Sequence, residues 1–89
     1  MPLQTIFDAY AREAVNKADI QPLDEGSFVG RVPGLVGVIA FGDTERDVVL
    51  ELFSVVEDWA RMRRERGAHV PVIGEVDLNT EEAERLLGY

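Results

Sequence analysis

The feature that most constrains this chain is a long apolar stripe that begins after Thr44. Apolar side chains recur there at the three- and four-residue spacing of one helical face, and they are Val48, Leu52, Val55, Val56, Trp59 and Met62. Thr44 is a good N-cap residue, and Gly67 supplies a C-terminal stop. A helix of about 23 residues measures roughly 34 Å at ~1.5 Å per residue. The stripe therefore predicts a long helix that covers a small sheet from end to end.

Three short strands are predicted before this helix, over residues 18–23, 27–32 and 36–41. Asp24-Glu25-Gly26 has the composition of a compact hairpin loop. Val32-Pro33-Gly34-Leu35 is typical of a type II turn, because proline presets φ and glycine accepts the positive φ that follows. Pro22 cannot donate to a ladder and marks an edge or a strand end. The tight turns predict an antiparallel meander.

The flanking segments complete one α+β domain over residues 1–89. Leu3, Ile6, Phe7, Tyr10 and Ala14 share one helical face, so a helix is predicted within residues 1–16. The core is predicted over 17–78, and its last part, 70–78, is predicted to form a final strand in the same sheet. Residues 79–89 are predicted to form a short helical tail.

The third predicted strand, Val36 to Phe41, has no polar side chain on either face. A strand with one wet face alternates apolar and polar residues, so both faces are expected to be covered. The long helix covers one of them. Either the N-terminal helix or a partner chain covers the other, which carries Ile39 and Phe41. We therefore predict a homo-oligomer, with Ile39, Phe41, Phe7 and Tyr10 as candidate interface residues.

Charge and hydropathy limit the classes of partner. The 89 residues carry a net charge of −8, which repels nucleic-acid backbones and anionic membranes and favours a basic protein partner. No apolar run approaches the ~20 residues of a membrane span, and the N-terminus lacks a secretion signal, so we expect a cytoplasmic protein. The absence of cysteine excludes disulfides and cysteine-ligated zinc.

Acidic residues on separate elements suggest one enzymatic alternative. Asp19, Glu51 or Glu57, and Asp77 could hold Mg²⁺ ions for phosphodiester cleavage. With 17 acidic residues in the chain, such placements also arise by chance on solvated faces. The only histidine, His69, has no evident catalytic partner. We therefore predict a protein that is not an enzyme, with no catalytic, cofactor-binding or metal-binding residue.

The only basic cluster ends the long helix, and it consists of Arg61, Arg63, Arg64 and Arg66. Cations there favour the negative end of the helix dipole, and Glu57, Asp58 and Glu65 lie within pairing distance at helical spacing. Phosphate contact is the alternative interpretation. Given the net charge, we expect no DNA binding by this chain alone.

Residues 32–44 resemble the core signature of HicB-like antitoxin domains, in which a proline–glycine turn, a short apolar strand and a glycine precede a Thr-capped helix. The resemblance continues through residues 56–59 and 67–71, and it covers about residues 17–78. Val36 stands where that family commonly has proline, and Glu51 replaces a frequent asparagine.

The resemblance implies a degraded ribonuclease-H-like fold and a role in masking HicA, a small basic ribonuclease toxin. By this resemblance the chain would bind such a toxin or be an orphan relative, and no catalytic residue is carried over. Family members that repress their own operon usually continue into a DNA-binding segment. Residues 79–89 are too few to form one, so a short form without it is expected.

Overall fold

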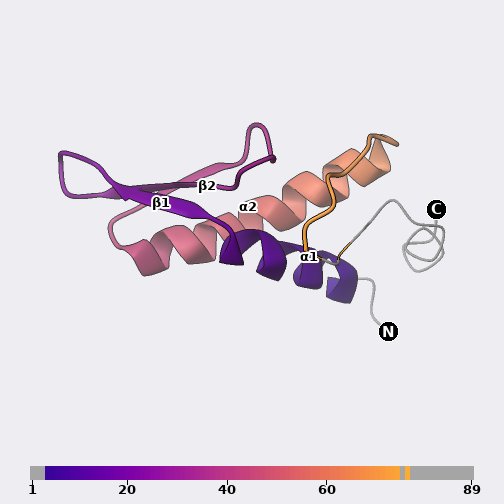
Figure 1. The fold of residues 1–89 in the computed structure, drawn as a ribbon, viewed down its shortest axis with the longest axis horizontal. Helices are drawn as coiled ribbons and strands as arrows, with labels where there is room; N and C mark the ends of the chain where they lie inside the picture. Colours follow the sequence, from indigo (N-terminus) through magenta and orange to yellow (C-terminus); the bar gives the residue numbers. More distant parts are fainter. Residues whose placement is uncertain (1–3, 75, 77–89) are drawn as a thin grey trace.

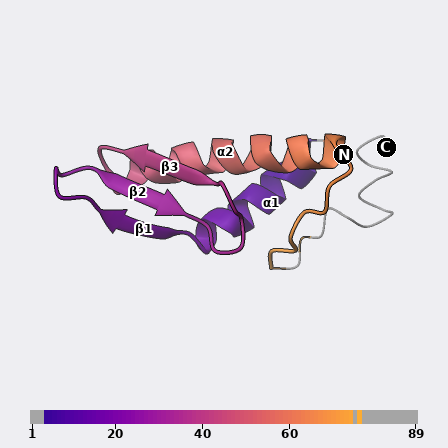
Figure 2. The ribbon, with the colours of Figure 1, turned by 90° about the horizontal axis from the view of Figure 1, so that it is seen from above.

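The structure, a computed structural model, describes residues 4–74 and 76. The elements along the chain are α1 (Gln4–Asn16), β1 (Asp19–Pro22), β2 (Phe28–Arg31), β3 (Ile39–Gly42) and α2 (Glu45–Glu65). This order confirms the predicted α+β layout of a helix, an antiparallel meander and a long helix. Both helices lie on the same side of the sheet (Figures 1 and 2).

The sheet is antiparallel, and β2 lies between β1 and β3. Ile20 pairs with Gly30, which pairs in turn with Ala40. Both predicted turns use glycine at positive φ, 98° at Gly26 and 88° at Gly34, a region that side chains with a Cβ rarely adopt. The turn chemistry in the sequence therefore identified both hairpins correctly.

The third strand begins later than predicted. Val36 and Gly37 form a second turn directly after the first, in which the Val38 amide donates to the Leu35 carbonyl at 3.2 Å. Gly37 has a φ of 89°, which ends any extended path before Val38. The prediction of a strand over 36–41 is therefore wrong at its start, because the Val36-Gly37 pair turns the chain again.

Both ends of α2 match their sequence signals. The Thr44 hydroxyl oxygen accepts a hydrogen bond from the Asp47 amide at 3.1 Å and caps the first turn. Gly67, with a φ of 71°, follows the last turn. Between these ends α2 lies close under β2. A Cβ on Gly30 would stand 2.5 Å from Cγ1 of Val48, so only glycine admits the helix at this point.

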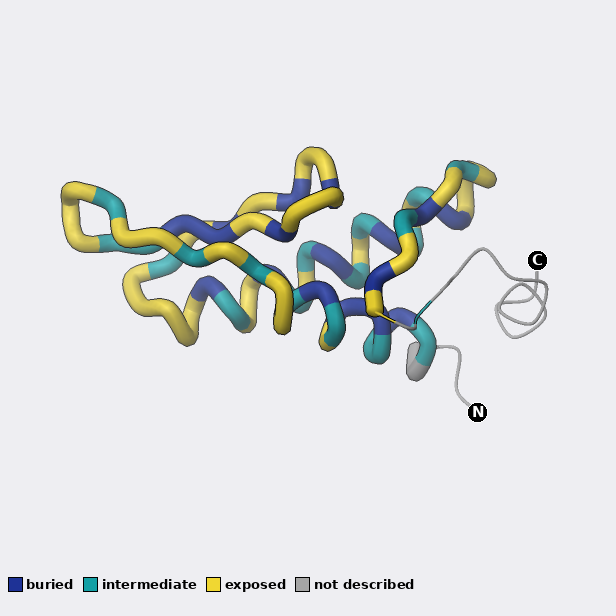
Figure 3. Tube along the Cα trace, in the orientation of Figure 1, coloured by how far each residue is buried: buried dark blue, intermediate teal, exposed yellow. Residues whose placement is uncertain are grey.

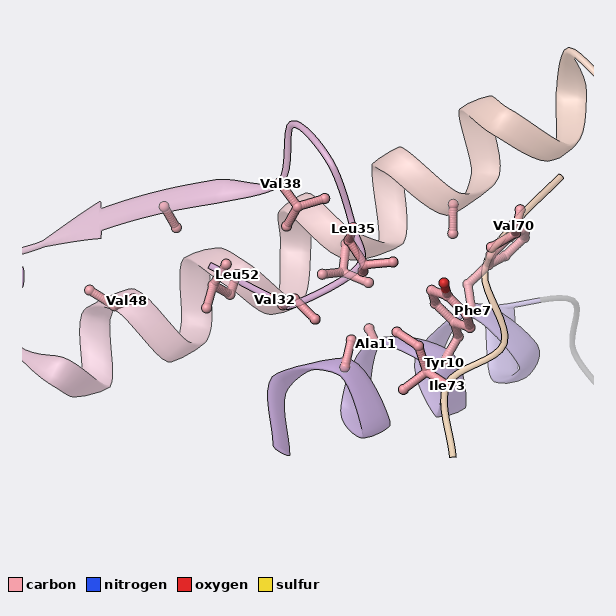
Figure 4. Packing of buried hydrophobic residues seen from close by; sticks show 14 residues of the cluster. Phe7, Tyr10, Ala11, Val32, Leu35, Val38, Val48, Leu52, Val70 and Ile73 are labelled. Atoms are coloured by element: carbon pink, nitrogen blue, oxygen red, sulfur yellow. The ribbon is translucent and has the colours of Figure 1, made fainter. Parts of the chain in front are cut away.

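One continuous core follows α2 along its length (Figure 4). Its buried members are Phe7, Tyr10, Ala11, Ala14, Val32, Leu35, Val38, Ala40, Val48, Leu52, Val56, Ala60, Val70 and Ile73. The first half of α2 packs under the sheet, and α1 packs against α2 on that same side (Figure 1). The sequence left two candidates to cover the second face of the sheet, the N-terminal helix or a partner chain. Because α1 packs on α2, it does not cover that face.

The predicted final strand over 70–78 is not formed in its described part. Ile73 and Val76 pair only with each other across a tight turn, and the Val76 amide donates to the Ile73 carbonyl at 2.9 Å. Pro71 has no amide hydrogen for a ladder, and its carbonyl accepts a 2.6 Å hydrogen bond from the Tyr10 hydroxyl. The segment therefore packs on α1 and does not join the sheet. Residues 77–78 and the predicted tail lie outside the described residues.

No helix in the described part of the chain is long and apolar enough to cross a membrane.

Two leucines on α2 test the helix–sheet core as a matched pair. Leu52 is fully buried, whereas Leu50 is 60% exposed on the same helix. Leu52→Ala should lower the free energy of unfolding by about 2 to 5 kcal/mol, because it leaves a cavity under Gly30. Leu50→Ala should change it by less than about 0.5 kcal/mol. Urea denaturation followed by circular dichroism measures both, and equal losses would contradict this core assignment.

The Tyr10 hydroxyl offers a pH-dependent test of the contact between α1 and Pro71. Burial raises the pKa of Tyr10 to about 12, against a smaller lowering by Arg63. Since this exceeds the ordinary value of 10.0, the neutral side chain stabilises the fold fully below pH 10, and this contribution is lost as the pH rises through 12.

Tyr10→Phe should cost about 1 kcal/mol at neutral pH, because the Pro71 carbonyl loses its donor. The difference from the wild type should shrink as the pH rises above 10. Thermal unfolding across this range measures it, and a difference that stays constant would show that the buried hydroxyl does not contribute in this way.

Candidate protein-binding surfaces

The sheet presents one face to α2 and one away from both helices. Ile20, Gly30 and Ala40 form a cross-strand row on the α2 side. Because side chains alternate along a strand, the neighbouring residues point the other way. We call this second surface the open face, and it consists of Asp19, Arg31 and Ile39 in one row and Gln21, Val29 and Phe41 in the next. Exposed and buried positions alternate along β3, whereas β1 has no buried position (Figure 3).

The open face combines exposed apolar side chains on β3 with polar side chains on β1 and β2. Phe41 is 59% exposed and Ile39 37%, and both lie opposite the buried Ala40, as the sequence predicted. Val29, between Gln21 and Phe41, is buried yet lies outside the main core cluster. The face therefore has a small apolar centre of its own that no described segment covers.

A hollow adjoins one end of the open face. Its volume is about 350 Å³, and its lining comes from Arg31, Ile39 and the double turn between β2 and β3. Val36, which is 89% exposed, stands at its rim. The turn that shortens β3 thus creates a concave surface beside the exposed apolar residues.

The structure separates the four predicted interface residues. Phe7 and Tyr10 are 4% and 0% exposed, and both belong to the main core beside Val70 and Ile73 (Figure 4). They cannot share a surface with Ile39 and Phe41. The predicted interface therefore reduces to Ile39 and Phe41, because the apolar stripe of α1 packs on α2 and not on the sheet.

A second surface lies on the outer side of α2, which we call the acidic face. It carries carboxylates, one arginine and two exposed apolar side chains, and it consists of Asp47, Leu50, Glu51, Ser54, Glu57, Asp58, Arg61, Met62 and Glu65. Met62 was predicted to lie on the buried stripe, but it is 45% exposed. It stands at the margin of that stripe, where helical spacing alone does not decide exposure.

Charges of the same sign crowd the middle of the acidic face. The pKa of the Glu57 carboxyl is raised by burial first, and then by the nearby carboxylates Asp8 and Asp58, while Arg61 lowers it. Arg61 lies 3.5 Å from Asp58, and Arg12 of α1 lies 3.9 Å from Asp8. The exposed Arg12 and the half-buried Arg61 therefore only partly compensate these carboxylates, and an added cation would be attracted here.

The carboxylates of the nuclease alternative do not converge among the described residues. Asp19 lies on the open face, whereas Glu51 and Glu57 lie on the acidic face, beyond the buried side of α2. Asp77 lies outside the described residues. Within residues 4–74 and 76, no cluster of three or more His, Cys, Asp or Glu side chains could hold a metal ion.

The arginine cluster at the end of α2 makes contacts within the chain. Arg63 donates from Nε and Nη2 to the His69 carbonyl at 2.9 and 2.7 Å, and its guanidinium stacks 5.0 Å from the Trp59 ring centre. The Arg61 guanidinium stands 5.0 Å from the Phe7 ring centre, and Arg64 is buried. Arg61 and Arg63 thus make contacts within the chain, and of the predicted acidic partners Asp58 lies 3.5 Å from Arg61.

Comparison with known proteins identifies the family. The crystal structure of TTHA0281 from Thermus thermophilus has a chain 32% identical to this one, with a TM-score of 0.70, and the match covers 86% of this chain and 99% of that one. No curated protein matches the chain. The UPF0150-like family, which is HicB-like and associated with toxin–antitoxin systems, matches residues 9–71. The chain belongs to the UPF0150-like family.

Proposed function

We propose that this protein is a non-catalytic, HicB-like antitoxin-type protein that binds and masks a small basic ribonuclease toxin of the HicA kind. An orphan relative that binds another small basic protein would use the same surface. The acidic face of α2 is the observation that carries the proposal, because it combines carboxylates with the exposed apolar side chains of Leu50 and Met62.

The charge on this face suits a basic partner. Opposite charges across an interface accelerate encounter and favour correct partners, and the crowding around Glu57 is relieved when a cation approaches. Leu50 and Met62 add apolar contact. They are separated by about 18 Å along the helix axis at ~1.5 Å per residue, which suits the width of a small protein. Methionine adapts its shape readily to a partner surface.

Family membership supports a role in a toxin–antitoxin system. The UPF0150-like match covers α2 and the strands before it, and it associates this fold with toxin–antitoxin systems. The resemblance of residues 32–44 to the HicB signature gives the finer expectation of a HicA-type partner.

A charge-neutralising pair of variants tests the acidic face directly. The probe is a small basic HicA-type ribonuclease, preferably the product of an adjacent gene, and the readout is suppression of its RNA cleavage. The wild-type protein should suppress cleavage at near-equimolar ratio. Glu51→Gln combined with Asp58→Asn should weaken binding at least about tenfold, or ~1.4 kcal/mol, because the face loses two charges.

The matched control is Asp24→Asn combined with Glu25→Gln. These residues are exposed at the hairpin between β1 and β2, so the change in net charge is the same while the acidic face is intact. The control should bind like the wild type. Equal weakening by both pairs would show that only the net charge matters, and no binding of the basic ribonuclease by the wild type would refute the proposal.

The absence of nuclease activity is tested separately. Purified protein incubated with RNA and Mg²⁺ should leave the RNA intact, because the described carboxylates lie on opposite surfaces. Gel electrophoresis of the products measures this. Cleavage that requires Mg²⁺ and disappears in Asp77→Asn would establish the enzymatic alternative instead.

A further inference from the structure

We infer that two copies of this chain associate through their open faces, so that the surface formed by β1, β2 and β3 is an interface between identical subunits. The inference goes beyond the proposed function, because it assigns a different surface, on the opposite side of the molecule from the acidic face. It rests on exposure, charge, the character of the two sheet edges and the hollow beside the double turn.

The first observation is an apolar surface left without a cover. Both helices lie on one side of the sheet, and no described segment crosses the other side (Figure 2). Phe41 and Ile39 are exposed there around the buried Val29, and Val36 extends the apolar surface at the turn. In a domain this small, such side chains are a large part of the apolar surface that water still reaches, so covering them stabilises the fold.

The charge on the open face favours a second copy of the chain over a basic partner. Asp19 and Arg31 are its only charged residues, and they are direct cross-strand partners. The face is therefore neutral on a chain whose net charge is −8. A basic partner gains little from a neutral surface, whereas a second copy meets no net repulsion there.

The same two residues make the face complementary to itself. In a face-to-face pair whose two-fold axis runs across the strands, Arg31 of one copy lies one strand away from Asp19 of the other, within reach of the long arginine side chain, and the reciprocal pair forms by symmetry. Each copy supplies one acid and one base, so both charges are paired across the interface. A surface bearing only one sign could not do this.

The two edges of the sheet differ in a way that centres the contact on β3. β1 begins at Asp19 and ends at Pro22, and both charge and proline discourage association along an edge. β3, which runs Ile39–Gly42, contains neither. The unprotected edge thus coincides with the two most exposed apolar residues of the face.

The hollow makes the two surfaces complementary in shape, because it can accept a side chain of the other copy. Phe41 stands toward the end of β3, and the hollow of about 350 Å³ adjoins the start of that strand at Ile39. A two-fold axis that runs across the strands reverses their direction, so Phe41 of one copy comes to lie over the hollow of the other. Arg31, which lines the hollow, stands beside this aromatic ring.

The mass of the wild-type protein in solution is the primary test. Light scattering coupled to gel filtration should give about twice 9.9 kDa at high micromolar concentration, with dissociation on dilution. Phe41→Ser should raise the dimer dissociation constant at least about tenfold, because it removes the central apolar side chain. Leu50→Ser, an equivalent change at an exposed residue of the acidic face, should leave the constant unchanged.

A charge-reversal pair then tests the two-fold arrangement. Asp19→Arg gives a face with two positive charges, and Arg31→Asp gives one with two negative charges. Each variant alone should fail to dimerise, whereas an equimolar mixture should recover a mixed dimer, detectable by native mass spectrometry. Circular dichroism of each variant checks the fold, and recovery on mixing cannot come from contacts within one chain.

Several results would overturn the inference. A wild-type mass of 9.9 kDa at every concentration would exclude the dimer. A dimer that Phe41→Ser leaves intact would show that the copies meet elsewhere. Loss of toxin binding in Phe41→Ser, with the wild type monomeric, would assign the open face to the basic partner instead.

Discussion

The close approach of α2 to the middle strand is the contact on which the rest of the structure depends. Gly30 lets Val48 and Leu52 reach the backbone of β2, and the first half of α2 therefore packs against the sheet. The second half extends past the sheet, where α1 and the segment around Pro71 cover it. Since α1 packs against α2, no described segment covers the far side of the sheet. One packing choice thus leaves both the open face and the acidic face available.

These two surfaces differ in the chemistry that each can recognise. The acidic face combines an excess of carboxylates with separated apolar side chains, which favours a partner of opposite charge. The open face has no net charge and exposes Ile39 and Phe41, with one acid beside one base, which favours a copy of itself. Since α2 and the core lie between the two surfaces, one can be occupied without blocking the other. A small domain can in this way serve as a dimer that presents two binding sites.

Local signals in the sequence predicted the fold well, and long-range packing accounts for the errors other than the late start of β3. Thr44 and Gly67 act within a few residues of themselves, and the helix ends that they mark were predicted correctly, whereas the strand predicted after the Gly34 turn began too early. The failed strand after Gly67 depends on a hydrogen bond between Tyr10 and Pro71, which are distant in sequence. The burial of Phe7 and the exposure of Met62 likewise depend on how α1 sits against α2. On the open face, Ile39 and Phe41 could be predicted because side chains alternate between the two faces of a strand. The acidic face could not be predicted, because the sequence does not show which side of α2 is exposed.

The central claim is that the two surfaces work independently and at the same time. Native mass spectrometry of the protein with a HicA-type basic ribonuclease tests it most directly, because it counts both chains in one complex. The account predicts two copies of this protein with two of the ribonuclease, with each α2 occupied and the open faces joined. A complex that contains a single copy of each chain, formed as the dimer disappears, would show that both partners compete for one surface and would contradict the account.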